Sequence, residues 1–285
     1  MPRALYYYSY PGLWEAFFRA IGTDVVLARP STRQTVETAG LISEAEHCLP
    51  MKMFDAHLAE LAGKADRVFV PRILSGRKGH ISCPKLAALP DAAGAQFGPR
   101  IPILTIDVNE DKVPLPTSLA ALGGMLGAGK KASRDAAHRA MEAMAGNLAG
   151  LAARRTGEPG SILILAHPYN LYDDFFSGPI VRKLASLKVG VNLVEFDRAD
   201  IPSGPIKWDT CSKMYDTLRR LDPKISRGVI QISSFNCGCD SIVGSFYHEI
   251  LARKRIPFMT LIIDEHTSNA GLGTRLEAFV DSCRW

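Results

Sequence analysis

The stretch Ser161-Ile-Leu-Ile-Leu-Ala166 is a continuous apolar run, which is typical of a strand buried on both faces of a parallel sheet. Similar runs follow along the chain, at 190–196, 228–234 and 257–263. Helical segments are predicted between them, near 179–188, 208–221 and 241–254, and a last helix is predicted at about 272–283. This alternation predicts an α/β fold, with a mostly parallel sheet and right-handed crossovers.

The first half of the chain shows a weaker form of the same pattern. Its predicted strands are 3–8, 24–28, 67–73 and 102–107, and its predicted helices are 12–21 and 51–62. Segment 75–100 is rich in Gly, Pro and Ala and is predicted to be a loop. A helix near 133–154 is expected to join two α/β lobes, residues 1–156 and 157–285, with the boundary near Gly157-Glu-Pro-Gly160.

Composition excludes several classes of protein. The 285 residues are 47% hydrophobic and carry a formal charge of +5, with scattered basic residues rather than a stripe that would follow a nucleic-acid backbone. There is no apolar run long enough to cross a bilayer, and the N-terminus does not resemble a signal peptide. We therefore expect a cytoplasmic protein with neither membrane nor nucleic-acid partners. Six cysteines in that reducing compartment favour metal binding or catalysis over disulfides.

Three predicted strands of the second lobe end in residues that carry chemistry. They lead into His167-Pro-Tyr169-Asn170, Cys237-Gly-Cys239-Asp240 and Asp264-Glu265-His266-Thr267. Open parallel sheets bind ligands at the carboxyl ends of their strands, so these side chains are expected at one edge. The alternative is that such polar residues form caps and turns, as Asp240 or Ser241 would by capping the next helix.

The cysteines suggest how metal would be held. Cys237 and Cys239 precede a predicted helix, where the dipole favours thiolate, although free cysteines are also often simply buried. Cys48 also precedes a predicted helix, and Cys83 lies in a glycine-rich loop before a proline. Wide spacing disfavours a zinc finger, and soft thiolates from several loops fit an iron–sulfur cluster better. The remaining two, Cys211 and Cys283, are predicted to be structural.

The order of the motifs resembles a known family over nearly the whole chain. It resembles the activator-linked relatives of 2-hydroxyacyl-CoA dehydratases, also labelled acyl-CoA dehydratase activase-related or double-cubane-cluster-like proteins. The motifs are Pro2-Arg-Ala-Leu-Tyr-Tyr-Tyr8, Cys48-Leu-Pro-Met-Lys52, Cys83-Pro84, His167-Pro-Tyr-Asn-Leu-Tyr-Asp173, Phe235-Asn-Cys-Gly-Cys-Asp-Ser241 and Ile263-Asp-Glu-His-Thr-Ser-Asn-Ala-Gly271.

This resemblance implies two flavodoxin-like (Rossmann-like) lobes with an oxygen-sensitive iron–sulfur cluster in the cleft between them. The cluster is a four-iron cubane, or a double cubane, and the matching ligand positions are Cys48, Cys83 and Cys237. One iron stays open to substrate. A separate ATP-hydrolysing activator with its own cluster supplies low-potential electrons, since no ATPase segment is fused here. The family favours dimers, as homodimers or with a related subunit.

One departure from the family pattern leaves the reaction open. Cys239 stands where relatives usually carry proline, so a fourth thiolate either closes the open iron site or points away from it. His167, Tyr169, His266 and Glu265 are candidate hydrogen-bond or proton donors, with structural hydrogen bonds, or a pairing of Glu265 with Arg275, as the alternatives. The favoured function is an ATP-coupled reductase or dehydratase-like enzyme. The alternatives are a non-catalytic electron carrier or cluster scaffold, and a cluster-free small-molecule binding module.

Overall fold

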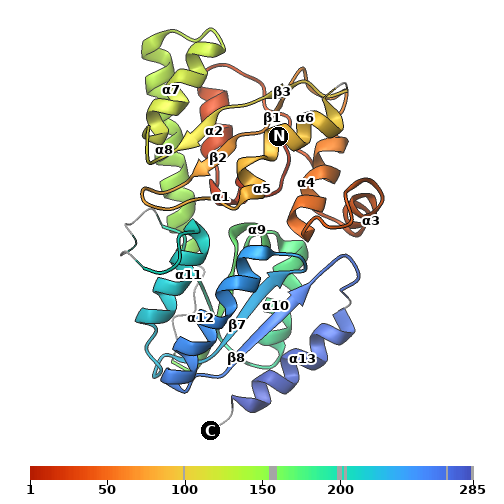
Figure 1. Ribbon diagram of the computed structural model, residues 1–285, viewed down its shortest axis with the longest axis vertical. Coiled ribbons are helices and arrows are strands. Elements are labelled where there is room, and N and C mark those ends of the chain that lie inside the picture. Colours follow the sequence, from red (N-terminus) through yellow and green to blue (C-terminus); the bar gives the residue numbers. More distant parts are fainter. Residues whose placement is uncertain (99, 154–158, 198–200, 202–203, 268, 284–285) are drawn as a thin grey trace.

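The computed structural model describes the chain apart from residues 99, 154–158, 198–200, 202–203, 268 and 284–285. The C-terminal half contains a parallel sheet with the strand order β6–β5–β7–β8 (Figure 1). Its strands are β5 (Ser161–Ala166), β6 (Val191–Leu193), β7 (Ser226–Ser234) and β8 (Phe258–Ile263). All four predicted strands are therefore confirmed. This is a doubly wound, flavodoxin-like order, in which the crossovers leave the first strand in opposite directions.

Four helices cover the two faces of this sheet. On one face α10 (Asp174–Ser186) contacts α13 (Asn269–Ser282), and on the other α11 (Asp209–Arg220) contacts α12 (Gly238–Lys254). Every residue of β5 is buried, as its continuous apolar run predicts. The short α9 (Pro168–Leu171) follows β5 directly and contacts the N-terminal half.

The N-terminal half is mainly helical around two interrupted parallel strand pairs, β1–β3 and β2–β4. Backbone hydrogen bonds from Val70 to Leu104 and from Arg72 to Ile106 bridge the interruptions. Its elements are α1 (Tyr6–Ser9), α2 (Leu13–Ala20), α3 (Arg33–Ile42), α4 (Leu49–Glu60), β1 (Val68–Phe69), β2 (Arg72–Ser75), α5 (Pro84–Ala87), α6 (Leu89–Phe97), β3 (Ile103–Leu104), β4 (Asp107–Asn109), α7 (Leu115–Met125) and α8 (Lys130–Ala152).

Three sequence predictions for this half are wrong. Segment 3–8 runs into the helix α1 instead of forming a strand: burial does not alternate from residue to residue, as it would in a half-buried strand, and Leu5 adopts a φ of 47°. Segment 24–28 forms no strand, although Ala28 donates a backbone hydrogen bond to Met1. Segment 75–100 contains α5 and α6, because a proline in the first turn of each helix starts it rather than breaking it.

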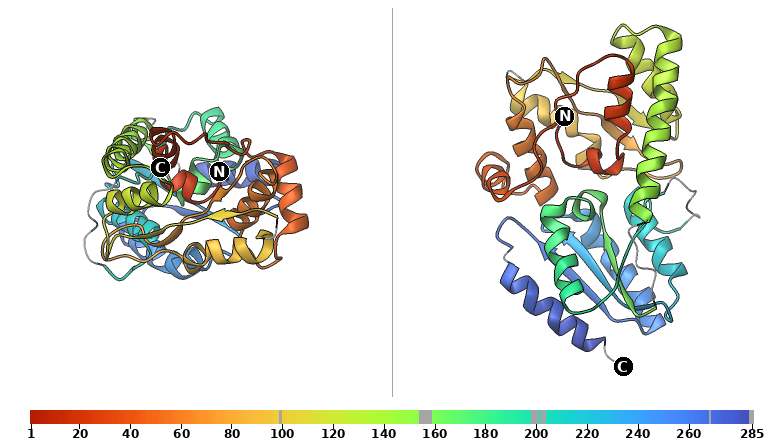
Figure 2. Two further views of the ribbon diagram at one scale, coloured as in Figure 1. Left: turned by 90° about the horizontal axis from the view of Figure 1, so that it is seen from above. Right: turned by 180° about the vertical axis from the view of Figure 1, so that it is seen from behind.

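The two halves are joined by packing as well as by the chain. Helix α8 runs along one side of the molecule toward the C-terminal half (Figure 2). The lobe boundary predicted between residues 156 and 157 lies outside the described residues. Buried residues of α3 and α4, among them Val36 and Met53, belong to the same hydrophobic cluster as the strands of the C-terminal half. The N-terminal end of α4 is thereby held against the carboxyl edge of the large sheet.

Candidate metal centre

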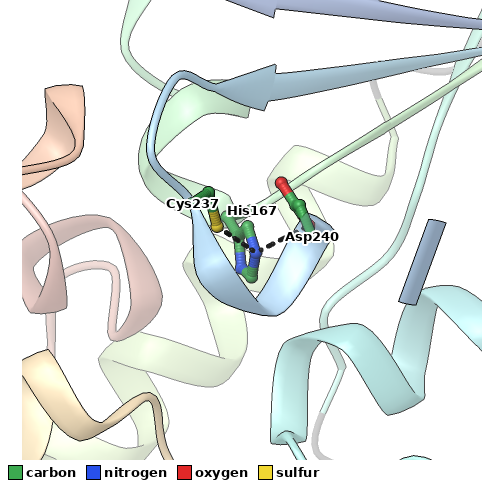
Figure 3. Close-up of side chains that lie close together, drawn as sticks. All are labelled: His167, Cys237 and Asp240. Carbon is green, nitrogen blue, oxygen red and sulfur yellow. Dashed lines mark hydrogen bonds and ion pairs between the residues drawn. The ribbon is translucent and has the colours of Figure 1, made fainter. Parts of the chain in front are cut away.

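The candidate site lies where the two central strands of the large sheet end. His167 follows β5 and Cys237 follows β7, and these strands are hydrogen-bonded neighbours on either side of the point where the strand order reverses. His167, Cys237 and Asp240 offer ligand atoms within 4.8 Å of one another (Figure 3). The sequence prediction that polar residues meet at this edge is correct for these elements.

Three of the predicted ligand cysteines occupy the same local position. Cys48, Cys83 and Cys237 are the N-cap residues of α4, α5 and α12, although the first two come from the N-terminal half. Backbone N–H groups, of Met51 for the first and Lys85 for the second, point at the thiols. N–H groups at a helix N-terminus stabilise thiolate, which is the form that binds metal.

These three thiols share one environment. Burial raises the pKa of Cys48 to about 11, with smaller contributions from the Cys237 and Cys83 thiols and a lowering by Lys85. A thiol influences another's pKa only when the two lie close together in a poorly solvated region. Cys48, Cys83 and Cys237 therefore meet in one region, from segments about 35 to 190 residues apart in the sequence.

Cys239 and Cys211 extend the group of thiols. A hydrogen bond with Cys211 and burial raise the pKa of Cys239 to about 12, against a lowering by its hydrogen bond with Cys83. Cys211 is completely buried, and its Sγ lies 3.9 Å from Nε2 of His167. The sequence prediction placed Cys211 in a helix, correctly, but did not place it near the other cysteines. Cys211 lies in the first turn of α11, and this helix begins at the same edge of the large sheet. That position in the predicted helix is the feature of the sequence that could have placed Cys211 near the other thiols.

His167 is locked in place by a buried ion pair. Nε2 lies 3.1 Å from Oδ1 of Asp240, and Nδ1 lies 2.7 Å from the Thr210 hydroxyl. Burial lowers the pKa of His167, but the charge and hydrogen bond of Asp240 outweigh it and raise the pKa well above its usual value. A protonated imidazole has no lone pair for a metal. Nε2, whose hydrogen points at Asp240, also lies 3.9 Å from the sulfur of Cys237, so the positive charge of the imidazolium faces that sulfur.

Tyr169 lies against the same residues. Its ring stacks on His167 with centroids 5.1 Å apart and an interplanar angle of 8°. Burial raises its pKa, and the nearby Cys237 and Cys48 thiols raise it further. The phenol therefore stays protonated and keeps an O–H to donate.

The other two predicted site residues lie away from the thiols. Glu265 forms an ion pair of 2.6 Å with Lys52 of α4, instead of with Arg275. Burial raises the pKa of Glu265, but the hydrogen bond from Lys52 outweighs it and lowers the pKa overall. His266 is exposed, in a turn where its backbone N–H donates to Asp264. Glu265 thus links the end of β8 to the helix that Cys48 caps, which is a structural contact.

A small cavity opens beside the thiols. It encloses about 80 Å³. Its lining comes from both halves and includes Tyr10, Arg77, Cys83, His167, Tyr169, Trp208 and Cys239. A ligand in this cavity would touch sulfur on one side and aromatic rings on the other.

The donor set fits an iron–sulfur cluster. Thiols are the ligands that such clusters prefer, and of these three Cys237 is buried, Cys48 and Cys83 are half-buried, and all three cap helix N-termini. Among the described residues, the single group compact enough for one ion contains just one thiol, Cys237, together with the paired His167 and Asp240. Cys48, Cys83 and Cys237 are thus spread around a larger volume, as ligands of a multi-atom centre are.

The fold and site together define an α/β protein with a buried, thiol-rich candidate metal centre between its two halves. Residues 1–196 match the family described as the CoA enzyme activase uncharacterised domain (DUF2229), and the chain belongs to this family. The family agrees broadly with the activase-related branch that the sequence motifs resemble. Cys48, Cys83, His167 and Tyr169 lie within the matched range, whereas Cys211, Cys237 and Cys239 lie beyond it. No curated protein matches the chain. No described helix is long and apolar enough to span a membrane.

Proposed function

We propose that the protein holds an iron–sulfur cluster through Cys48, Cys83 and Cys237 and takes part in ATP-coupled reduction or dehydration of a small substrate. In this proposal a separate activator delivers low-potential electrons, in a role related to the CoA-dehydratase systems. When bound, the cluster supplies one-electron transfer and, at an iron without a protein ligand, a place for substrate. A cubane or a double cubane is compatible with the thiols present.

The observation that carries the proposal is the meeting of three helix-capping cysteines from distant segments. Backbone N–H groups of Met51 and Lys85 point at the sulfurs of Cys48 and Cys83, and hydrogen bonds of this kind stabilise reduced clusters. A single buried cysteine is common, because the side chain packs as a small hydrophobe. Three at the same position before a helix, near one another in the fold, support a shared role in metal binding.

Other side chains of the site would support the chemistry without binding iron. His167, held by Asp240, would place the positive charge of its ring 3.9 Å from the sulfur of Cys237 and stabilise negative charge there. Tyr169 and the lining ring of Trp208 would exclude water and orient a ligand in the cavity. The small volume favours a small substrate, or the reactive end of a larger one, over a whole coenzyme A ester.

Anaerobic expression followed by iron and acid-labile sulfide counting tests the proposal. We expect the wild-type protein to contain at least four irons per chain on the cubane scheme, and the variants Cys48→Ala, Cys83→Ala and Cys237→Ala each to lose most of them. Cys283→Ala is the matched control, because this buried thiol packs near Gly228, toward the amino-terminal end of β7 and away from the site. Colourless wild-type protein without iron, or equal iron in all four variants, would refute the proposal.

A non-catalytic electron carrier is the second candidate, favoured by one observation. Cys239 is hydrogen-bonded to Cys83 and lines the same cavity, so a fourth thiolate is at hand to close the site. The two functions differ in the magnetic resonance spectrum of the reduced cluster. A spectrum that changes when a small exogenous ligand is added indicates an open iron, and an unchanged spectrum that becomes responsive in Cys239→Ala indicates a closed one.

A further inference from the structure

Strand β8 is the outer strand of the large sheet and pairs on one side only. It follows β7 in the strand order β6–β5–β7–β8 and is in register with β7 along its whole length (Figure 1). On that side the carbonyl group of Ile263 accepts a hydrogen bond from the N–H of Phe235. Successive residues of a strand point their backbone groups to opposite sides, so the N–H and C=O groups of Phe258, Thr260 and Ile262 point away from β7.

This outer edge is open. Among the described residues, no backbone or side-chain group forms a hydrogen bond with the outward N–H and C=O groups of Phe258, Thr260 and Ile262. Thr260 is exposed, and the side chain of Ile262 is 51% exposed. The strand Phe258–Ile263 contains neither a charged residue nor a proline, which are the residues that commonly keep an edge strand from pairing. An apolar edge of this kind is a template for a further strand.

We propose that β8 pairs in antiparallel orientation with β8 of a second copy of this chain, across a two-fold axis, so that the two large sheets become one continuous sheet. With Thr260 on the axis, Phe258 lies opposite the partner's Ile262. Every outward N–H of one strand then meets an outward C=O of the other, because the pairing residues all have their free backbone groups on the facing edges. The contact is closed and self-complementary, since both copies use the same strand.

The charges on either side of β8 favour a second copy in this orientation. The residues before the strand, Arg253-Lys254-Arg255, are basic, and the residues after it, Asp264-Glu265, are acidic. Antiparallel pairing brings the basic end of each strand beside the acidic end of the other. The register centred on Thr260 sets Arg255 near the partner's Glu265. Arg255 is exposed at the C-terminal end of α12, so its side chain is accessible for this contact.

The pairing would also cover apolar side chains of the edge. Phe258, Thr260 and Ile262 lie on one face of the sheet, since alternate residues of a strand share a face. The ring of Phe258 would contact the partner's Ile262, and the symmetric contact forms at the other end of the strand. A pair of an aromatic and a β-branched side chain stabilises antiparallel strands. The half-exposed Ile262 is thereby removed from water.

Sedimentation velocity of the reduced full-length protein tests the proposal, which does not depend on a bound cluster. We expect the wild type to sediment as a dimer at concentrations on the order of 10 μM. Ile262→Lys should raise the dissociation constant at least about tenfold, because a charge on the edge blocks strand pairing. Arg255→Glu should also raise it, because like charges then meet, whereas Arg134→Glu, on the exposed surface of α8, is the matched control and should have no effect.

A proline at the centre of the edge separates backbone pairing from side-chain contact. Thr260→Pro removes an outward N–H and leaves the hydrogen bonds to β7 in place, so it should weaken the dimer while the single chain stays folded. Thr260→Val keeps that N–H and should dimerise as the wild type does. Thermal unfolding of both variants verifies that they are folded.

A cysteine on the two-fold axis tests the register. Residues that exchange both hydrogen bonds across antiparallel strands have Cα atoms about 5.5 Å apart, within the range of a disulfide. Thr260→Cys should therefore form a covalent dimer under mild oxidation, and the control Ala132→Cys, exposed on α8, should not. A wild type that remains monomeric at about 100 μM, a dimer that both Ile262→Lys and Thr260→Pro leave intact, or equal cross-linking of the two cysteine variants would overturn the proposal.

Discussion

Acid should destabilise this protein through the imidazole of His57. The side chain is completely buried in α4, where its Nε2 donates to the Ser31 hydroxyl at 3.1 Å, and Ser31 in turn donates to Asp173 of the C-terminal half. Its Nδ1 is buried and finds no hydrogen-bond partner within the described part of the chain. Burial lowers the pKa of His57 from 6.5 to about 4, so the folded protein keeps this imidazole neutral.

The sign and size of the effect follow from the two pKa values. Between pH 6.5 and about 4 the unfolded chain binds a proton at His57 that the folded chain does not. The free energy of unfolding therefore falls as the pH falls, by about 1.4 kcal/mol per pH unit. The total is on the order of 3 kcal/mol, and it levels off below the folded pKa. Above pH 6.5 the group contributes no pH dependence.

Denaturant unfolding of the apoprotein under reducing conditions measures this contribution. His57→Gln keeps a neutral polar side chain but cannot titrate, so the wild-type minus variant difference isolates the imidazole from the other groups that titrate in the same range. We expect this difference to change by on the order of 3 kcal/mol between about pH 7 and pH 4, in the direction of a less stable wild type. High salt should alter it little, because the group is buried. Parallel stability curves for the two proteins would refute the reasoning.

Two further substitutions probe packing and charge. Gly123→Ala should lower the free energy of unfolding by about 1–3 kcal/mol, because a Cβ there would lie 2.5 Å from the Ser133 hydroxyl, where α7 packs on α8. The control Gly124→Ala has open space around its Cβ and should be neutral or slightly stabilising. Urea unfolding of the pair checks this, and equal stabilities would contradict it. Lys52→Met should lower the free energy of unfolding by about 1–3 kcal/mol, because it leaves the Glu265 carboxylate without its ion-pair partner. Adding Glu265→Gln should restore part of that stability. A double variant less stable than Lys52→Met alone would contradict the ion pair as the cause.

The C-terminal half could be predicted well because its strands are buried on both faces. Continuous apolar runs such as 161–166 identify such strands directly, and helix periodicity fills the intervals between them. In the N-terminal half the strands are two to four residues long and interrupted, so period and length give little signal. The three tyrosines at 6–8 have high strand propensity, yet tertiary packing of Tyr6 among Trp14 and Phe69 determines their conformation.

The site could be predicted only as far as local signals reach. A cysteine immediately before a helix is visible in the sequence, and Cys48 and Cys237 have that position in the structure. The pairing of Asp240 with His167 joins residues 73 apart, and nothing in the local sequence separates it from a helix cap. The same limit applies to Cys211, because its neighbours in the chain give no sign that it lies near Cys239.

Metal binding should strengthen the same contacts between the halves that acid weakens. Cys48 and Cys83 belong to one half and Cys237 to the other, so a centre that all three hold exists only when the halves are together. Any group that binds the folded form alone adds about 2.7 kcal/mol of stability at a free concentration of one hundred times its dissociation constant. This is comparable with the destabilisation expected from His57, whose helix carries Cys48 at its N-terminal end. Position at the junction thus couples the chemistry of the thiols to the closure of the fold: a protein loaded with metal should stay closed under mild acid that opens the apoprotein.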